Sequence, residues 1–231
     1  MNTHKKTFGT YFALALMGAI LSAGQTAFAD SYPLDSCLVS GEKLGSMGDP
    51  IVKEYDGREI RFCCGGCPKK FEANQESYME KVDAAIVEQQ TPFYPTEKCV
   101  VSGEKIGGDM GDPIEFVYQN RLVRLCCKGC IKKLKADPDK YLAELDQQVI
   151  AEQKATYPLS TCVASGDKLG GDMGDPVEYV FANRLVRLCC KGCKKDFNAD
   201  PAKYLAKLDA GSPGTKAGKA KSGDGHGAHK H

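Results

Sequence analysis

The stretch NRLVRLCCKGC decides the fold of this chain: it occupies residues 120–130 and recurs without change at residues 183–193. A related stretch, GREIRFCCGGC, occupies residues 57–67. An identical run of eleven residues is too long to arise by chance, so we interpret the chain as three copies of one unit.

The cysteines follow the same repeat. Each copy contains one early cysteine and a cluster of three that begins 26 or 27 residues later, and all twelve cysteines belong to this pattern. The three sets are Cys37 with Cys63, Cys64 and Cys67; Cys99 with Cys126, Cys127 and Cys130; and Cys162 with Cys189, Cys190 and Cys193. Four thiols from two ends of a short unit are the donors of a tetrahedral thiolate site. The sequence therefore predicts one Zn²⁺ or Cu⁺ ion per repeat.

Residues 1–29 have the pattern of a secretory signal peptide. A short basic region at residues 4–6 precedes an uncharged apolar run at residues 8–21, and residues 27–29 form a small-x-small cleavage site. The apolar run is shorter than the roughly 20 residues that a membrane span needs. We expect cleavage between Ala29 and Asp30 and a periplasmic or secreted protein without a membrane span.

The charge balance gives no reason to propose nucleic acid as a partner. The chain has a formal net charge of +1, and removal of the two lysines in residues 1–29 makes it −1. Residues 211–231 are rich in Gly and Lys and predict a disordered tail. Its histidines, His226, His229 and His231, are candidates for weak secondary metal binding.

Each repeat is expected to contain a β-hairpin. The repeats span residues 32–83, 94–146 and 157–209, and in the first an apolar-rich pair of runs flanks Asp56-Gly57. Asp-Gly is a strong signal for a two-residue hairpin turn, because both positions adopt positive φ. The other copies have Gln119-Asn120 and Ala182-Asn183 at this point.

The pattern after each cysteine cluster is helical. In the first copy Phe71, Tyr78 and Val82 share one face of a single expected helix. In the later copies Asp137-Pro138 and Asp200-Pro201 predict that a second helix begins at the proline. Residues 79–90 and 141–154 are expected to form helical linkers. A unit of this size buries too small a core to be stable alone, and the thiols are the expected staple.

The order of Cys, hairpin, Phe/Leu-Cys-x3-Cys, helix and Asp-Pro-x-x-Tyr resembles the TRASH domain and the related YHS domain. The resemblance implies a small α+β fold of three treble-clef-like modules linked with heavy-metal trafficking, resistance or sensing. It places the family's three thiolates on Cys37, Cys63 and Cys67 and on their counterparts in the other copies. The spacing from first to second cysteine is longer than in that family.

A second departure concerns the fourth ligand. Treble clefs usually carry a Cys-x-x-Cys knuckle, but here its second position is a serine: Ser40, Ser102 or Ser165. We call these the turn serines. Each cluster contains one additional cysteine, Cys64, Cys127 or Cys190, and we call these the edge cysteines. We expect the edge cysteines to supply the fourth ligand; the alternative is a three-coordinate site that favours Cu⁺ over Zn²⁺.

Other interpretations remain open from the sequence. The thiols could form two disulfides per repeat in an exported protein. Alternatively, the Cys-x-x-Cys pairs could cycle between the dithiol and the disulfide form. A structural zinc array that mediates protein–protein contacts is the alternative to metal handling with an acceptor or transporter protein as partner. Met47, Met110 and Met173 are expected to be packed loop plugs rather than thioether ligands. The three repeats contain no histidine and no phosphate-binding loop, so we do not expect an enzyme.

Overall fold

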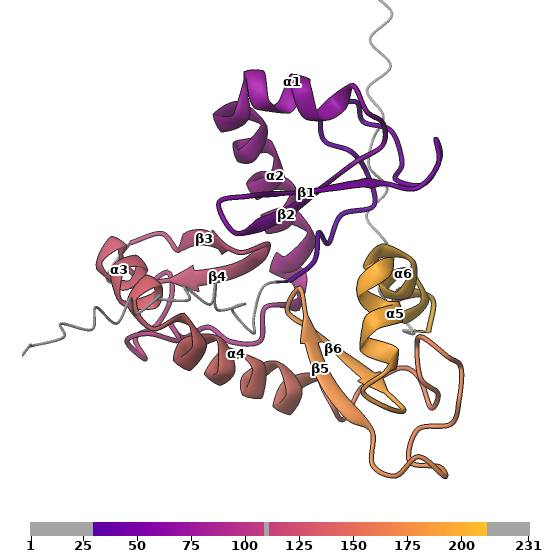
Figure 1. Ribbon diagram of the computed structural model, residues 1–231. Coiled ribbons are helices and arrows are strands. Elements are labelled where there is room, and N and C mark those ends of the chain that lie inside the picture. The colour runs from indigo at the N-terminus through magenta and orange to yellow at the C-terminus, as the bar shows by residue number, and fades with distance from the viewer. Residues whose placement is uncertain (1–29, 109–110, 212–231) are drawn as a thin grey trace, which may run out of the picture.

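The computed structural model describes residues 30–108 and 111–211 (Figure 1). The predicted signal peptide, Met110 and the three histidines of the tail lie outside these residues. Gly211, the first residue of the predicted tail, is the last residue of a helix. Within the described ranges, no helix is both long and apolar enough to cross a membrane.

The described chain is small α+β, with an antiparallel hairpin and two helices in each repeat. A short 3₁₀ turn at Thr91–Phe93 follows the first set. The elements are β1 Ile51–Tyr55, β2 Arg58–Phe62, α1 Cys67–Ala73 and α2 Gln75–Gln90; β3 Ile114–Tyr118, β4 Arg121–Leu125, α3 Lys128–Ala136 and α4 Pro138–Gln153; and β5 Val177–Phe181, β6 Arg184–Leu188, α5 Cys193–Ala199 and α6 Pro201–Gly211.

The three hairpins have the tight turns that the sequence predicts. In the first, Tyr55 pairs with Arg58, and the two residues between them have φ of 52° and 74°. Gln119-Asn120 and Ala182-Asn183 also adopt positive φ at both positions. Turns of this kind match the right-handed twist of the flanking strands, which fixes the register of each hairpin.

The expectation of a single helix after the first cysteine cluster is wrong. α1 ends at Ala73 and α2 begins at Gln75, with Asn74 between them at φ −142° and ψ 47°. Asp137 and Asp200 have nearly the same backbone conformation, and α4 and α6 begin at the following proline as predicted. Asn74 is the N-cap residue of α2 but makes no side-chain cap hydrogen bond, so the break here occurs with neither a proline nor a side-chain cap.

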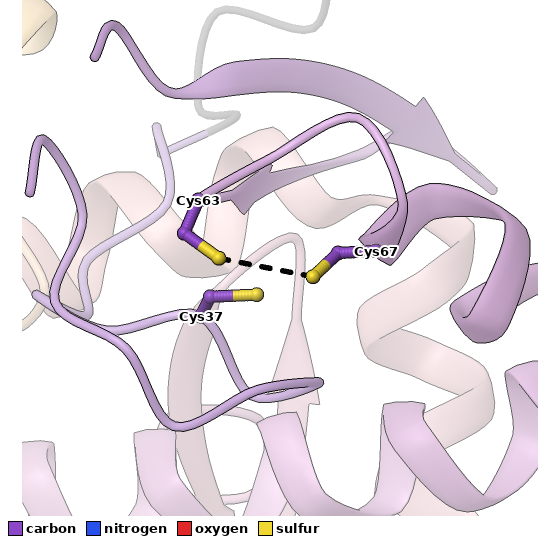
Figure 2. A group of neighbouring side chains, drawn as sticks. All are labelled: Cys37, Cys63 and Cys67. Atoms are coloured by element: carbon purple, nitrogen blue, oxygen red, sulfur yellow. Dashed lines mark hydrogen bonds between the residues drawn. The ribbon is translucent and has the colours of Figure 1, made fainter. Parts of the chain in front are cut away.

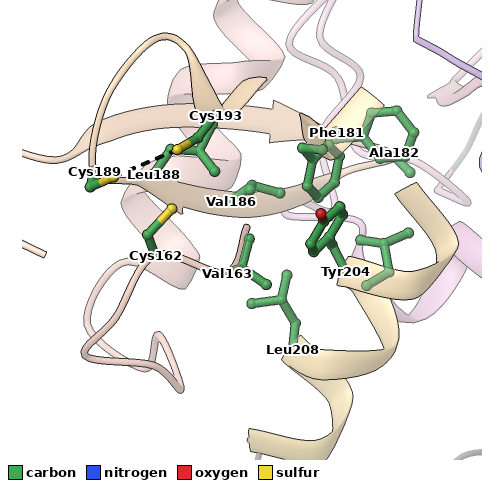
Figure 3. Close-up of a cluster of buried hydrophobic side chains, with 12 residues drawn as sticks. Cys162, Val163, Phe181, Ala182, Val186, Leu188, Cys189, Cys193, Tyr204 and Leu208 are labelled. Carbon is green, nitrogen blue, oxygen red and sulfur yellow. Dashed lines mark hydrogen bonds between the residues drawn. The ribbon is translucent and has the colours of Figure 1, made fainter. Parts of the chain in front are cut away.

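Each repeat has its own apolar core, built between the hairpin and its helices. In the first, Phe62 and Phe71 pack edge to face with ring centroids 5.4 Å apart, and Phe71 stacks on Tyr78. In the third, Phe181 packs edge to face with Phe197, which stacks on Tyr204; Figure 3 shows Phe181 and Tyr204 in this core. The buried cysteines form one end of each core.

The second helix of one repeat packs against the hairpin of the next, and a glutamine makes this contact specific. α2 lies on β3 and β4, and α4 lies on β5 and β6. Gln90, which is fully buried, donates to the carbonyl of Asn120 and accepts from the N–H of Leu122. Gln153 makes the same two contacts with the turn of the third hairpin.

An asparagine at each later hairpin tip contacts the preceding repeat. Asn120 accepts from the Nε of Arg58 and donates to the carbonyl of Glu59. Asn183 accepts from Arg121 Nε at 2.9 Å and donates to the carbonyl of Leu122. These buried side chains lock neighbouring repeats in one orientation.

Polar contacts also join the first repeat, with the residues that flank it, to the third. The guanidinium of Arg61 donates to the carbonyls of Asn198 and Ala199 at the end of α5, both at 2.7 Å. The carboxylate of Asp30 accepts from the N–H of Ala182 at the tip of the β5–β6 hairpin, which Figure 1 shows directed to the middle of the molecule. These polar contacts join the repeats without sulfur, whereas the role of the thiols as a staple within each repeat stays a prediction.

Candidate metal centres

Three local structures bring three sulfurs together in each repeat. Cys37 lies in a turn in which the N–H groups of Ser40 and Gly41 both bond its carbonyl, and an antiparallel bridge between Ser36 and Lys43 closes that turn. Cys63 directly follows β2, and Cys67 is the first residue of α1. Their sulfurs point toward one another (Figure 2).

The geometry suits a metal ion. In each repeat three buried sulfurs lie within 4.8 Å of one another, and we call these sets the buried trios: Cys37, Cys63 and Cys67; Cys99, Cys126 and Cys130; and Cys162, Cys189 and Cys193. The sulfurs of the second and third members are 3.7, 3.8 and 3.6 Å apart. Four thiolates about 2.3 Å from a zinc ion lie about 3.8 Å from each other in a tetrahedron. The spacing is therefore that of coordinating sulfurs.

The turn serines contact the buried trios. The hydroxyl of Ser40 lies 3.1 Å from the sulfur of Cys63, and the same contact in the other repeats measures 3.2 Å for Ser102 and 3.4 Å for Ser165. The sequence identified these serines only as missing ligands. Their recurrence three residues after the first cysteine is the signal that could have indicated a hydrogen-bonding role.

The edge cysteines lie beside the buried trios without belonging to them. The sulfurs of Cys64, Cys127 and Cys190 are 3.5, 3.7 and 3.7 Å from the third cysteine of their own repeat. They are partly exposed, whereas the other nine cysteines are buried. Their assignment as fourth ligands stays a prediction, since the set of mutually close sulfurs contains only three.

Hydrogen bonding favours the thiolate form of the first cysteine in each repeat. Burial acts to raise the pKa of Cys37, but hydrogen bonds from the backbone N–H of Cys63, from Ser40 and from the backbone of Val39 outweigh it and lower the pKa to about 7. The pKa values of Cys99 and Cys162 are also lowered to about 7 by bonds of this kind, against the effect of burial.

The third thiol of each site behaves in the opposite way. Burial, together with the neighbouring sulfurs, raises the pKa of Cys67 to about 12, and the same causes raise those of Cys130 and Cys193 to about 12. A metal ion must displace this proton when it binds. Metal binding by the trio is therefore expected to release protons and to strengthen as pH rises.

Other candidate ligands do not join these sites. Met47 and Met173 are 63% and 62% exposed, so the prediction that they plug their loops is wrong for both. In these loops Leu44 and Leu169, which precede the methionines, pack against the core instead. All twelve cysteines lie within the described residues as free thiols, so the disulfide interpretation finds no bridge there.

Comparison with known proteins gives no family for the chain: no protein-family model, no curated protein and no solved structure matches it. The three buried trios are therefore the basis on which a function is inferred.

Proposed function

We propose that each repeat binds one Zn²⁺ or Cu⁺ ion through its buried trio and that the ion is cargo, carried for trafficking, buffering or resistance in an exported compartment. The observation that carries this proposal is the threefold recurrence of three buried sulfurs at coordination distance. Thiolates select soft or borderline ions, and Zn²⁺ and Cu⁺ are the common ones.

The way the repeats are held together supports cargo over a structural metal. Each repeat has an apolar core, and Gln90, Asn120 and Asn183 join the repeats without using sulfur. A fold held in this way can lose its ions and keep its shape. A structural zinc array that presents surfaces to a protein partner would instead depend on its ions for folding.

Metal stoichiometry tests the proposal. Reduced protein should bind about three equivalents of Zn²⁺ or Cu⁺, one for each buried trio, as measured by native mass spectrometry and elemental analysis. Replacing Cys37 by Ser should remove one equivalent and leave two. Protein that binds no metal when fully reduced would contradict the proposal.

Chelation separates cargo from scaffold. A strong chelator, added under reducing conditions, should remove the ions while circular dichroism shows retained helix and strand. Loss of secondary structure on chelation would favour the structural array. Delivery would be supported by transfer of the ion to an acceptor or transporter protein. The transfer is measured as the metal content of each protein after the two are separated.

Two triple variants test the fourth ligand. Replacing all three edge cysteines by Ser should lower Zn²⁺ affinity by several orders of magnitude and lower Cu⁺ affinity less, since Cu⁺ accepts three ligands. Replacing all three turn serines by Ala is the matched control, because it removes a sulfur contact but no sulfur. Unchanged Zn²⁺ affinity in the cysteine variant would refute the fourth-ligand role.

The remaining parts of the proposal follow from the sequence. We propose export with cleavage before Asp30, which N-terminal sequencing of the mature protein would test. We propose neither an enzymatic activity nor nucleic acid as a partner. The tail histidines are proposed as weak metal ligands, and titration of a chain that ends at Gly211 would measure their contribution.

A further inference from the structure

The edge cysteines form a second kind of sulfur pair that the metal site does not by itself explain. Each lies three residues before the last cysteine of its trio, as in Cys64-Gly65-Gly66-Cys67. The two sulfurs are 3.5 Å apart in the first repeat and 3.7 Å apart in the second and third. The same pair therefore occurs three times.

The backbone between the two cysteines already has a shape that a disulfide accepts. The N–H of Cys67 bonds the carbonyl of Cys64 at 3.2 Å, and Cys130 bonds Cys127 in the same way at 3.1 Å. Such a turn holds the two Cα atoms within about 7 Å, near the upper end of the range that disulfides span. Closing the bond requires the sulfurs to approach by side-chain rotation from this separation to about 2.05 Å.

Exposure differs sharply within the pair. Cys64 is partly exposed, whereas Cys67 and Cys63 are 3% and 2% exposed. Gly65 and Gly66, both exposed, lie between the pair and present no side chain that covers the edge cysteine. A soluble oxidant therefore reaches the edge cysteine first, with the buried thiol directly behind it.

We propose that each edge cysteine and the last cysteine of its trio form a reversible disulfide that switches the metal site off. This proposal rests on the proposed metal binding, whose regulation it describes. Oxidation removes the third thiolate of the trio together with the proposed fourth ligand and leaves Cys37 and Cys63, which are too few to hold Zn²⁺ in a four-coordinate site. Reduction restores the third thiolate.

The chemistry is thiol–disulfide exchange with a small organic disulfide, RSSR. The thiolate of Cys64 attacks one sulfur of RSSR, which forms a mixed disulfide and releases one RS⁻. The thiolate of Cys67 then attacks the sulfur of Cys64 and releases the second RS⁻. The protein loses two protons and two electrons, and RSSR becomes two RSH. A bound metal ion would hold Cys67 and slow the second step.

The other pairings in the cluster are less favourable. A bridge between the adjacent Cys63 and Cys64 would be strained. Cys63 and Cys67 are also close, at 3.7 Å, but both are buried, so an oxidant in solution has no direct access to either. The switch is therefore assigned to the pair with one accessible member.

The test uses purified, metal-free, full-length protein with oxidised glutathione as the probe. Peptide mapping by mass spectrometry should find Cys64–Cys67, Cys127–Cys130 and Cys190–Cys193 bridges. Zn²⁺ capacity should fall at least tenfold and return on addition of a dithiol. Protein loaded with Zn²⁺ beforehand should form these bridges at least tenfold more slowly.

The matched control replaces the three edge cysteines by Ser and keeps every buried trio. Because loss of the proposed fourth ligand weakens its Zn²⁺ affinity, this variant is compared only with its own untreated state, and its capacity at saturating Zn²⁺ should be the same before and after the oxidant. Bridges that map to other cysteines, or equal loss of capacity in the variant, would overturn the proposal. The Zn²⁺ capacity of the reduced protein is measured first, and a reduced protein that binds no Zn²⁺ would contradict the proposed function. The mapped bridges test the disulfide separately, because they form or fail to form whether or not the protein binds metal.

Discussion

The buried asparagine at the tip of the third hairpin offers a direct test of how the repeats are held together. Asn183 is fully buried at φ 58°, and its side chain makes three hydrogen bonds, to Arg121, Leu122 and Gln90. We expect Asn183→Gly to destabilise the protein strongly. Glycine keeps the left-handed backbone without strain, so the loss of hydrogen bonds is the main effect.

The magnitude follows from the groups left behind. The Nε of Arg121 and the carbonyl of Leu122 lose this partner inside the protein, at about 1–3 kcal/mol each, whereas Gln90 still accepts from the N–H of Leu122. The free energy of unfolding should fall by about 2–6 kcal/mol, a large share of the 5–15 kcal/mol typical of a domain. With a slope of about 2 kcal/mol per molar urea, the midpoint falls by about 1–3 M.

The assay is urea unfolding of reduced protein, followed by circular dichroism and by tyrosine fluorescence so that one cooperative transition is verified. Ala182→Gly is the matched control in the same turn. Ala182 is buried at φ 51°, and glycine keeps its N–H bond to Asp30. Loss of its methyl group lowers the free energy of unfolding by about 0.8 kcal/mol. Glycine adopts positive φ without the steric cost that alanine has there, which raises the free energy of unfolding by about 1–2 kcal/mol. Equal effects of the two substitutions would refute the reasoning.

Three further predictions address other contacts. Gln90→Leu should lower the free energy of unfolding by about 2–6 kcal/mol in the same urea assay, because it leaves two buried backbone groups of the second hairpin unpaired; a loss under about 1 kcal/mol would contradict this. Burial raises the pKa of Asp30 from 3.8 to about 7, which favours the neutral acid in the fold, so its contribution to stability should be greatest near pH 4 and decline as pH rises to 7. Asp30→Asn should lack this part of the pH dependence, and melting temperatures of both proteins at pH 5 and pH 8 would show the difference. Ser40→Ala should raise the pKa of Cys37 above about 7 by removing one of the hydrogen bonds that lower it, which a pH titration of thiolate absorbance would detect against the unmodified protein.

One arginine in each repeat makes a related set of contacts. Arg58 and Arg121 each pair with an acidic residue of the helix in their own repeat and with the asparagine of the following hairpin. Arg184 pairs with Asp209 in the same way, and within residues 30–108 and 111–211 no further hairpin follows β5–β6. The guanidinium of Arg184 lies over the ring of Phe93 instead, 4.3 Å from the centroid. The last repeat thus uses a cation–π contact where the others use an asparagine.

The sequence alone was sufficient for the elements that depend on neighbouring residues. The hairpin turns follow from the φ preferences of Asp, Asn and Gly, and the later helices begin at Pro138 and Pro201 because proline suits the first turn. The recurrence of the cysteines identified the residues of all three buried trios. These features are local or periodic, so a single sequence carries them.

The contacts between repeats, and the division of the cysteines into buried trios and edge cysteines, depend on the tertiary structure. Asn120 and Arg58 are 62 residues apart, and Asp30 and Ala182 are 152 apart, so their hydrogen bonds depend on how whole units stack. The family resemblance singled out the three cysteines of each trio, but only the structure shows that these three are buried together and that the fourth is left partly exposed. That difference arises because the consecutive cysteines Cys63 and Cys64 lie between β2 and α1, where the folded backbone alone specifies the direction of each side chain.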